Sequence, residues 1–379
     1  MIKMGVDMNS GVFVNTGKGY TAFKPSKLVD VEKELDISEI QLLIERANLA
    51  VGELRAMEKM LPNPALLMER YALKESVLSS QIEGTQSTLV DILEKKNDTS
   101  DNTDIREVKN YFNALNFGVN NLQREDGLPL SGRLLRECHR ILMSDVRGGD
   151  RLKTPGEFRT SQNWIGGNCP ANAIYVPPVA SDINEYMSDI ENYIHHGMHP
   201  NMVKAALVHY QFETLHPFQD GNGRIGRLLI LLFMIDKKIL NSPTLYISLY
   251  LKKMQNEYYA SLTKVRHSAD FIQWINFFLE GVIAVSEQTM TTTKKIIELE
   301  NKDRTRLKTG GLIRAFDVLM KKPVVSIKDM QEELGVTNAT ANSLIKKLEA
   351  EQILVQKNNK QRYRIYAYKN YLDIIESGL

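Results

Sequence analysis

A twelve-residue segment, His216 to Arg227, concentrates the side chains of this sequence that could do chemistry. It reads His-Pro-Phe-Gln-Asp-Gly-Asn-Gly-Arg-Ile-Gly-Arg. Histidine has an ordinary pKa that suits a general base near neutral pH. A carboxylate such as Asp220 suits a hard cation such as Mg²⁺, which proteins bind through one or two carboxylates together with substrate phosphates. The segment therefore indicates proton transfer next to a bound anion.

The end of this segment leads into an apolar run, Leu228 to Ile235, which is typical of a central buried helix. A loop that enters a helix through Gly221 and Gly223 exposes backbone N–H groups at the positive end of the helix dipole, where anions bind. Arg224 and Arg227 are three residues apart, so they project from one helical face and can hold phosphate oxygens. This combination predicts phosphate-transfer chemistry.

Each part alone is weak, because a histidine beside proline is usually packed and Gly-Asn-Gly is usually a turn. Together they resemble the active-site motif of the Fic family, His-Pro-Phe-x-Asp/Glu-Gly-Asn-Gly-Arg-x-x-Arg, at every defined position. The resemblance extends over roughly residues 30–295. It implies an all-α fold, a helical bundle with a small β-hairpin flap. It also implies transfer of AMP from ATP to a Ser, Thr or Tyr hydroxyl of a target protein, the enzyme itself included.

The resemblance gives each motif residue a role. His216 would deprotonate the target hydroxyl, Asp220 would hold Mg²⁺, and Phe218 would anchor the loop in the core. The groups that would bind the phosphates of ATP are Gly221, Asn222 and Gly223, as an anion hole, and Arg224 and Arg227, on the distal phosphates. The candidates for an adenine pocket are Tyr250, Asn256, Tyr258 and Tyr259, although tyrosines at helical spacing are more often core residues.

Residues 163–178 interrupt the helical pattern. Two β-prone pieces flank a turn-rich centre, which predicts a hairpin. Their residues are Asn163, Trp164 and Ile165, then Ile174, Tyr175 and Val176. The resemblance makes this hairpin the flap that holds the target segment as an added strand, a mode that recognises main chain more than side chains.

A regulatory element is predicted ahead of the motif. Ser79-Ser80-Gln81-Ile82-Glu83-Gly84 fits the inhibitory-helix pattern Ser/Thr-x-x-x-Glu-Gly/Asn of many Fic proteins. It ends a helix that Asn63-Pro64 would begin and Gly84 would stop. Glu83 would pair with Arg227 and remove the guanidinium that should hold the γ-phosphate. The alternative is that Glu83 is a solvated residue at a helix end.

The length of 379 residues exceeds one ordinary core, so two or three domains are expected. The boundaries that we predict are 1–100 for an N-terminal arm and helices that include the inhibitory helix, 101–300 for the catalytic core, and 301–379 for a C-terminal domain. A short strand is expected near Val12–Val14, and Asn301–Thr309 is expected to be a linker. Helical periodicity covers 104–122, 130–145, 181–197, 200–214, 222–236, 251–265 and 270–299.

The C-terminal segment, residues 306–379, has 13 basic and 8 acidic residues. Ser326 with Asp329, and then Thr337, predict two capped helices, and two strand-like pieces follow around the polar tip Lys357–Arg362. This order is similar to a winged helix-turn-helix domain. Its second helix would offer Asn338, Thr340, Asn342, Ser343, Lys346 and Lys347 to DNA phosphates and bases. DNA binding and a role in dimerisation or docking both stay open.

Composition narrows the remaining classes. Only two cysteines occur, so neither a disulfide framework nor a Cys-rich zinc site is expected. No apolar run reaches the ~20 residues of a membrane span and the N-terminus lacks a signal-peptide pattern, so we expect a cytoplasmic protein without a membrane partner. His195-His196-x-x-His199 lacks the partners of a metal site and favours a loop.

Three questions stay open at this level. The rival from another class is a DNA-binding regulator whose nucleotide site is a sensor. A further alternative is a Fic enzyme that transfers another phosphate-containing group or removes AMP. The sequence leaves the target and the oligomeric state, a homodimer included, undetermined.

Overall fold

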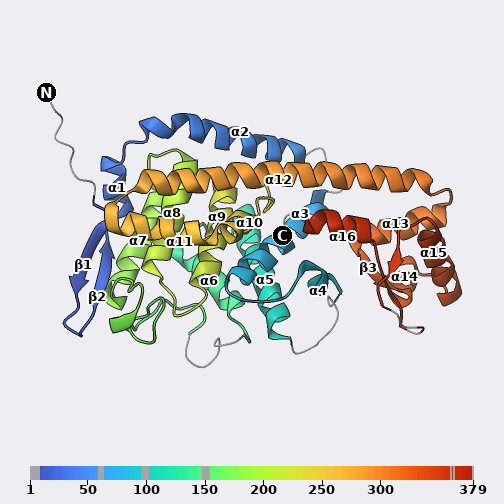
Figure 1. Cartoon of the computed structure of the whole chain (residues 1–379), viewed down its shortest axis with the longest axis horizontal. Coiled ribbons are helices and arrows are strands. Elements are labelled where there is room, and N and C mark those ends of the chain that lie inside the picture. The colour runs from blue at the N-terminus through green and yellow to red at the C-terminus, as the bar shows by residue number, and fades with distance from the viewer. Residues whose placement is uncertain are drawn as a thin grey trace. The chain divides into compact units, whose positions relative to one another are not determined.

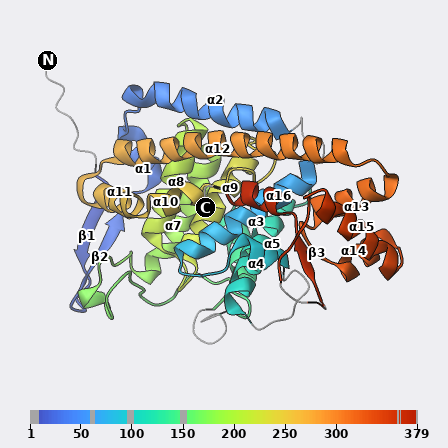
Figure 2. The same ribbon diagram turned by 45° about the vertical axis from the view of Figure 1, so that its right-hand side comes forward.

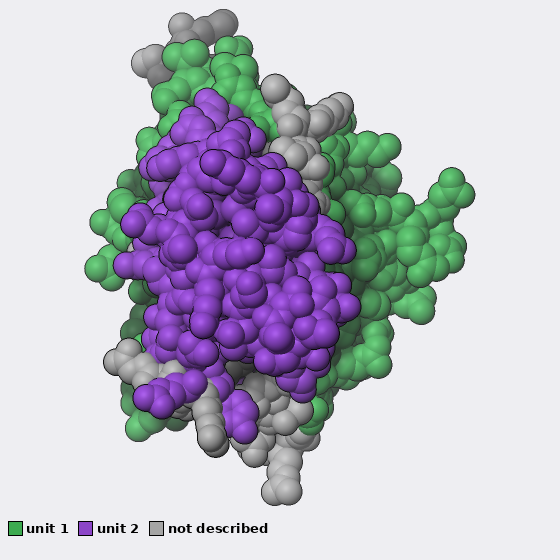
Figure 3. Space-filling view, turned by 90° about the vertical axis from the view of Figure 1, so that its right-hand side faces the viewer, with its two compact units in different colours: residues 1–86, 106–287 green, residues 87–105, 288–379 purple. Residues whose placement is uncertain are grey.

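The computed structural model describes residues 9–58, 64–94, 102–146, 154–358, 361 and 363–377. The chain forms two compact units (Figure 3). Unit 1 comprises residues 1–86 and 106–287, and unit 2 comprises residues 87–105 and 288–379. Unit 1 thus joins the N-terminal arm and helices to the segment that contains the motif. The three-domain division at residues 100 and 300 stays a prediction.

Unit 1 is mainly helical (Figures 1 and 2). Its elements are β1 (Gly11–Asn15), β2 (Thr21–Pro25), α1 (Leu28–Glu34), α2 (Gln41–Glu58), α3 (Pro64–Ile82), α5 (Thr103–Gln123), α6 (Gly132–Leu142), α7 (Ile183–His196), α8 (Asn201–Leu215), α9 (Asn222–Asp236), α10 (Ser248–Lys253), α11 (Gln255–Ser268) and the first part of α12 (Phe271–Arg306). Short 3₁₀ turns cover Ser38–Ile40, Pro170–Asn172 and Ala180–Asp182.

Helix α9 is the central element of this unit. Leu228 to Met234 are all at most 1% exposed, and the helix packs against α8, α6 and α3. A helix that is apolar on every face is most stable when other elements surround it, because each side chain is then removed from water. The motif residues at the start of α9 are therefore held by a closely packed helix.

The N-terminal arm forms a hairpin. The strand expected near Val12–Val14 is confirmed as β1, and it pairs antiparallel with β2, which the sequence analysis did not anticipate. The Phe23 N–H of β2 donates to the Val176 carbonyl (2.9 Å), so the hairpin lies beside the segment predicted as the flap. Phe23 itself is fully buried.

The segment predicted as a hairpin, 163–178, has less regular structure than expected. A single antiparallel bridge joins Ile165 and Tyr175, and a 3₁₀ turn at Pro170–Asn172 fills the centre. Two prolines follow directly at 177 and 178, and they have no N–H to extend a ladder. The pairing is therefore limited to one bridge.

The prediction of a linker at Asn301–Thr309 was wrong for residues 301–306, because α12 continues to Arg306. Its polar run is held by ion pairs one helical turn apart, Arg304 with Glu300 (3.2 Å) and Arg306 with Asp303 (3.2 Å). Charged residues that are good helix formers therefore extended the helix where their polarity had suggested a linker.

Unit 2 contains the remaining elements. They are α4 (Leu89–Glu94), the second part of α12, α13 (Gly310–Lys321), β3 (Val324–Ser326), α14 (Ile327–Leu334), α15 (Asn338–Ala350), β4 (Val355–Gln356), β5 (Ile365–Ala367) and α16 (Lys369–Glu376), with the strands in the antiparallel order β3-β5-β4. The two predicted caps are confirmed: Ser326 forms a capping box with Asp329, and the Thr337 hydroxyl accepts from the Thr340 N–H.

The winged-helix domain stays a prediction, and the order of helices and strands in unit 2 agrees with it. On α15 the residues predicted to face DNA are exposed, except Asn342, which is half-buried. Part of the predicted tip, at residues 359, 360 and 362, lies outside the described residues. In the described part of the chain, no helix is both long and apolar enough to cross a membrane.

Candidate active site

The motif loop joins α8 to α9 through two left-handed residues. His216 ends α8 with φ 49°, and Gly221 precedes α9 with φ 73°. Between them Phe218 is fully buried, and its ring stacks on His139 with centroids 3.8 Å apart. The loop is thus fixed at both ends and in the middle.

Asn222 closes this loop through its side chain. Its Oδ1 accepts from the Phe218 N–H (2.7 Å) and its Nδ2 donates to the Phe218 carbonyl (2.8 Å). A role of Asn222 in an anion hole stays a prediction, and its side-chain amide is engaged in the loop. The backbone N–H groups of the first turn of α9 have no partner within a helix, and these are the groups that can face an anion.

A cavity of about 1090 Å³ lies above this loop. Its wall includes the motif residues His216, Asp220, Gly221, Asn222, Gly223 and Arg227, together with Glu83, Glu213, Trp164, Ile165, Ile174 and residues of the β1–β2 hairpin. A predicted base, a predicted metal ligand, a helix N-terminus and an arginine therefore line the same cavity.

His216 is held neutral by its surroundings. Loss of water around the imidazole lowers the pKa of His216 to about 4, and the nearby Arg266 and Arg159 act in the same direction. At neutral pH the ring therefore carries no charge and can accept a proton, which is what a general base requires.

Asp220 lies in the cavity wall, where its Oδ1 accepts from the Gly221 N–H (2.7 Å). Among the described residues, no group of three or more His, Cys, Asp and Glu side chains is arranged to hold a metal ion. A single carboxylate fits Mg²⁺ only where phosphate oxygens and water complete the shell, which is the usual arrangement on a nucleotide.

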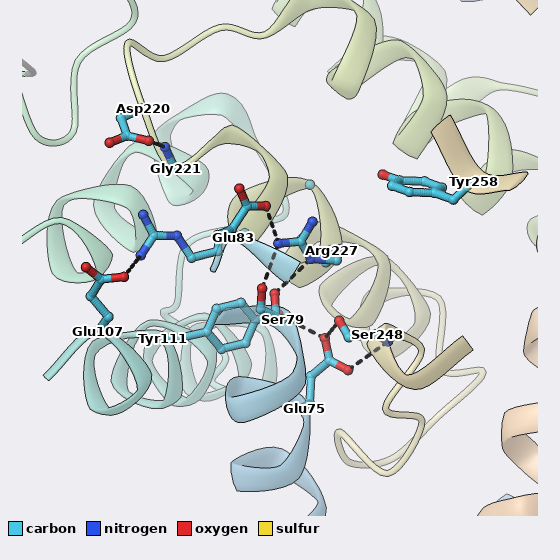
Figure 4. Close-up of polar contacts among 12 residues, drawn as sticks. Glu75, Ser79, Glu83, Glu107, Tyr111, Asp220, Gly221, Arg227, Ser248 and Tyr258 are labelled. Atoms are coloured by element: carbon cyan, nitrogen blue, oxygen red, sulfur yellow. Dashed lines mark hydrogen bonds and ion pairs between the residues drawn. The ribbon is translucent and has the colours of Figure 1, made fainter. Parts of the chain in front are cut away.

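Arg227 is bound by Ser79 and Glu83 at the end of α3 (Figure 4). Its Nη2 contacts Glu83 Oε1 (2.7 Å) and the Ser79 carbonyl (2.9 Å), and its Nε donates to Ser79 Oγ (2.9 Å). Burial raises the pKa of the Glu83 carboxyl, but the Arg227 guanidinium outweighs it, so the net pKa lies below its ordinary value. Glu83 is thus ionised and paired, not simply a solvated residue.

The contact depends on a glycine of the motif. A Cβ atom at Gly223 would lie 2.4 Å from Glu83 Oε1 and 2.9 Å from Arg227 Nη1. Any larger residue at position 223 would push the ion pair apart. Gly84, at φ 99°, ends the segment that carries Glu83, as the pattern predicted.

Helix α3 is fixed below this pair by a buried carboxyl. Glu75 accepts from the Tyr111 hydroxyl (3.2 Å) and from the Ser248 N–H (3.1 Å). Burial raises the pKa of Glu75 to about 7. The network ties α3 to α5 and α10, so the position of Glu83 is set by three helices.

Arg224 and Arg227 have different surroundings, and the expectation that both hold phosphates stays a prediction. The Nη1 of Arg224 pairs with Glu107 Oε2 of α5 (3.2 Å), and Arg224 is not part of the cavity wall. Residues three apart in an α-helix point about 60° from each other, so Arg224 and Arg227 are neighbours on the helix but meet different partners.

The flap residues divide into two groups. Asn163 is buried, and its Nδ2 donates to the His216 carbonyl (3.0 Å) and the Phe218 carbonyl (2.8 Å). Tyr175 and Val176 are also buried, the former through a bond from its hydroxyl to the Thr214 carbonyl (2.7 Å). Asn163 and Tyr175 thus join the flap to the motif loop and the end of α8, while Tyr175 and Val176 also form part of the cavity wall.

The other group is exposed and lines the cavity. Trp164 and Ile165 are each more than a third exposed, and Ile174 is 85% exposed. These apolar side chains are the flap positions that a target segment can meet.

The candidates for an adenine pocket are only partly brought together. Tyr258 and Tyr259 line the cavity, and the Tyr258 hydroxyl contacts His209 Nε2 (2.9 Å). Tyr250 and Asn256 are not in the cavity wall: Tyr250 packs on Phe277 (centroids 5.2 Å apart), and Asn256 is exposed to solvent. Tyr250 belongs to α10 and Asn256 to α11, and neither lies in the cavity wall.

Two further residues of the site, Arg159 and Glu213, were not predicted from the sequence. Arg159 is 2% exposed and donates to the carbonyls of His216, Ser161, Pro178 and Leu215, so it ties the flap to the motif loop. A lone arginine in a loop gives no sequence signal of this role. Glu213 lies in the cavity wall three residues before His216, and this helical spacing is the signal that could have identified it.

Comparison with known proteins places this site in a family. Residues 41–120 match the model described as Fic/DOC family N-terminal, and residues 129–234 match the model of the Fic/DOC family. The chain is 30% identical over 157 residues to Protein adenylyltransferase Fic of Drosophila grimshawi, covering 40% of this chain and 29% of that protein. It is 37% identical over 100 residues to the same-named protein of Culex quinquefasciatus, covering 25% and 18%.

The fold has solved counterparts. A Fic family protein from Desulfovibrio desulfuricans G20 superimposes with a TM-score of 0.57 at 20% identity, covering 88% of this chain and 96% of that one. At this identity the likeness concerns the fold alone. The sequence matches to the two insect proteins span less than a third of those proteins' own length.

Proposed function

Since the chain carries the N-terminal domain and the Fic domain of the Fic family, we propose that it is a protein adenylyltransferase that transfers AMP from ATP to a hydroxyl side chain of a target protein. The observation that carries this proposal is the shared cavity wall of His216, the start of α9 and Arg227. It combines a neutral base with an anion-binding helix end.

The reaction follows from these positions. The target hydroxyl attacks the α-phosphorus of ATP and gives its proton to the imidazole of His216. A new bond forms between the hydroxyl oxygen and phosphorus, the bond from the α-phosphorus to the bridging oxygen breaks, and pyrophosphate leaves. The first-turn N–H groups of α9 face the negative charge that develops on the α-phosphate.

Asp220 is the residue that would hold Mg²⁺. The ion, when bound with nucleotide, supplies positive charge against the phosphate oxygens. Asp220 also fixes the loop through the Gly221 N–H, so one side chain orients both the cation and the anion-binding backbone.

Glu83 is the proposed brake on this reaction. It occupies Arg227, which would otherwise hold the distal phosphates of ATP and align the α-phosphate with the hydroxyl. Nucleotide would then enter in an unproductive pose. Release of Glu83 from Arg227 is the event that would start transfer.

Labelled ATP tests the proposal. Wild type and Glu83→Gly, each with Mg²⁺, are incubated with ATP labelled at either the α- or the γ-phosphate, and covalent label is measured on denatured protein. AMP transfer predicts label only from the α-position. Label from the γ-position would instead indicate phosphate transfer, and reversible binding alone would favour the nucleotide-sensing regulator.

Unit 2 supports a second candidate function, contact with DNA. Helix α15 exposes Asn338, Thr340, Ser343, Lys346 and Lys347 after its Thr337 cap. If lysines contact phosphates, the affinity of the full chain for duplex DNA should fall with salt, with a log–log slope of about −0.9 per phosphate. Lys346→Ala with Lys347→Ala should make the slope shallower. Absence of binding at low salt would leave docking or dimerisation as the role.

A further inference from the structure

A buried carboxyl that the proposed reaction does not use lies in the wall of the same cavity. Glu213 belongs to α8, is 7% exposed, and lines the cavity with His216 and Arg227. Its Oε1 is buried and has no hydrogen-bond partner among the described residues. A buried carboxylate without a donor is costly, whereas the carbonyl oxygen of a protonated carboxyl is much less so.

The helix that binds the anion makes room for this side chain. A Cβ atom at Gly226 would lie 2.2 Å from Glu213 Oε1, much closer than any real contact. Gly223 makes room for Glu83 in the same way. Two carboxyls thus lie against two glycines of α9, and Arg227 directly follows the second.

The charges around Glu213 come from three elements. Burial raises the pKa of Glu213 to about 7, Arg227 of α9 and Arg266 of α11 lower it, and Glu83 beyond the end of α3 raises it. Glu213 also affects Tyr258 of α11. Burial and the neighbouring Glu213 carboxyl hold the pKa of Tyr258 well above its ordinary value. Glu213 can therefore gain or lose a proton in the physiological range.

We propose that the protonated Glu213 is part of the polyphosphate subsite beside Arg227, where its O–H donates to a phosphate oxygen of the nucleotide, and that the ionised form weakens nucleotide binding. A protonated carboxyl has one donor and can contact an anion, whereas a carboxylate has only acceptors. A bound polyphosphate also favours the protonated form, because like charges raise a pKa. The inference rests on the proposed function for the presence of a polyphosphate in the cavity.

The test measures the affinity of the full chain for ATP with Mg²⁺ by calorimetry between pH 6 and pH 8.5. If only the protonated form binds, the Kd of wild type should rise by roughly 30-fold across this range for a pKa near 7. Glu213→Gln keeps the size and a donor but cannot ionise, so its Kd should lack this rise. The ratio of the two Kd values cancels the titration of ATP itself.

Two further arms separate donation from mere loss of charge. Glu213→Leu keeps the volume without a donor and should bind ATP about tenfold or more weakly than Glu213→Gln at every pH. Adenosine, which has no phosphate, should bind wild type with the same affinity across the pH range. Equal melting temperatures of the three chains show that the comparison concerns the site and not the fold.

A constant ratio of the wild-type and Glu213→Gln Kd values across the pH range overturns the inference, as does a pH-dependent affinity for adenosine. If ATP binds with the expected profile but no AMP is transferred, the proposed function falls while this inference stands. If ATP does not bind wild type at any pH, both fall.

Discussion

The two ends of the cavity around His216 are built in opposite ways. At the start of α9 the side chains are buried and already paired: Arg227 with Glu83 and Ser79, and Asn222 with the backbone of Phe218. At the flap, a single bridge joins Ile165 and Tyr175, and Ile174, directly beside this bridge, is 85% exposed.

The difference separates two tasks. Phosphate chemistry needs donors held in place before the substrate arrives, and buried, paired groups provide this. Recognition of a protein target needs a surface that is available to another chain, and exposed apolar side chains beside a short backbone bridge provide that. The experiments below test whether these tasks are as separate as the geometry indicates.

The largest effect is expected for His216→Ala. Loss of a positioned general base typically lowers the rate by about 10²- to 10⁴-fold. The affinity for ATP should change little, because the phosphate contacts come from α9 and Arg227. His267→Ala, which removes another histidine of the same cavity wall, is the control and should retain transfer. Undiminished label on the His216 variant would remove its assignment as the base.

The second effect is a gain. Glu83→Gly frees Arg227, and transfer should rise by about 10- to 100-fold, the equivalent of one hydrogen bond between charged groups. Glu83→Gln keeps the length but not the charge and should give an intermediate rate. Adding Arg227→Ala should abolish the gain, measured as α-labelled AMP on the protein. A Glu83→Gly chain no faster than wild type would return Glu83 to a structural role.

Within the flap, Asn163 and Ile174 should respond differently. Asn163→Ala removes two bonds to the motif loop, so it should lower the free energy of unfolding by about 1 to 2 kcal/mol and slow self-labelling. Ile174→Ala removes an exposed side chain and should leave the melting temperature and ATP affinity unchanged, with a loss only in transfer to a target. Equal melting temperatures for both variants would contradict this division.

The smallest effect expected is a near absence of pH dependence on the acid side. A base works only when unprotonated, so its rate falls as pH drops through its pKa, and the low pKa of His216, about 4, moves that fall below the usual histidine range. The kcat/KM of Glu83→Gly/Glu213→Gln should therefore change by no more than about 10% between pH 7 and pH 5.5. The Glu213 substitution removes the other titration. A midpoint near 6.5 would mean that the imidazole is open to water.

The motif could be identified from the sequence because its residues act locally. Gly221, Gly223 and the apolar helix after them determine their own geometry, and the Glu83–Arg227 pair followed from a second local pattern at a helix end. The Arg224–Glu107 ion pair could not be predicted, because Glu107 lies more than a hundred residues away and nothing in the local spacing points to it. The same holds for Arg159, whose four carbonyl partners come together only in the folded chain.

Elsewhere, residue type alone did not determine the structure. Asn301–Arg306 looked like a linker because it is polar, but charges of opposite sign one turn apart stabilise a helix. Tyr250 and Tyr258 had equal claims by residue type, and only the rotation of their helices decided that Tyr258 faces the cavity. In both cases the residue types were evident from the sequence, but the contacts that their side chains make were not.

The space that Gly223 leaves open has a consequence for how the sequence of this protein can change over generations. The same absent side chain admits Glu83 to Arg227 and leaves the helix end open to an anion. A substitution at position 223 would therefore disturb inhibition and catalysis together. The proposed inhibitory carboxyl, Glu83, comes by contrast from a segment far from the motif in sequence. Under that proposal, substitutions at Ser79 or Glu83 would change the inhibition while the motif loop stays unaltered.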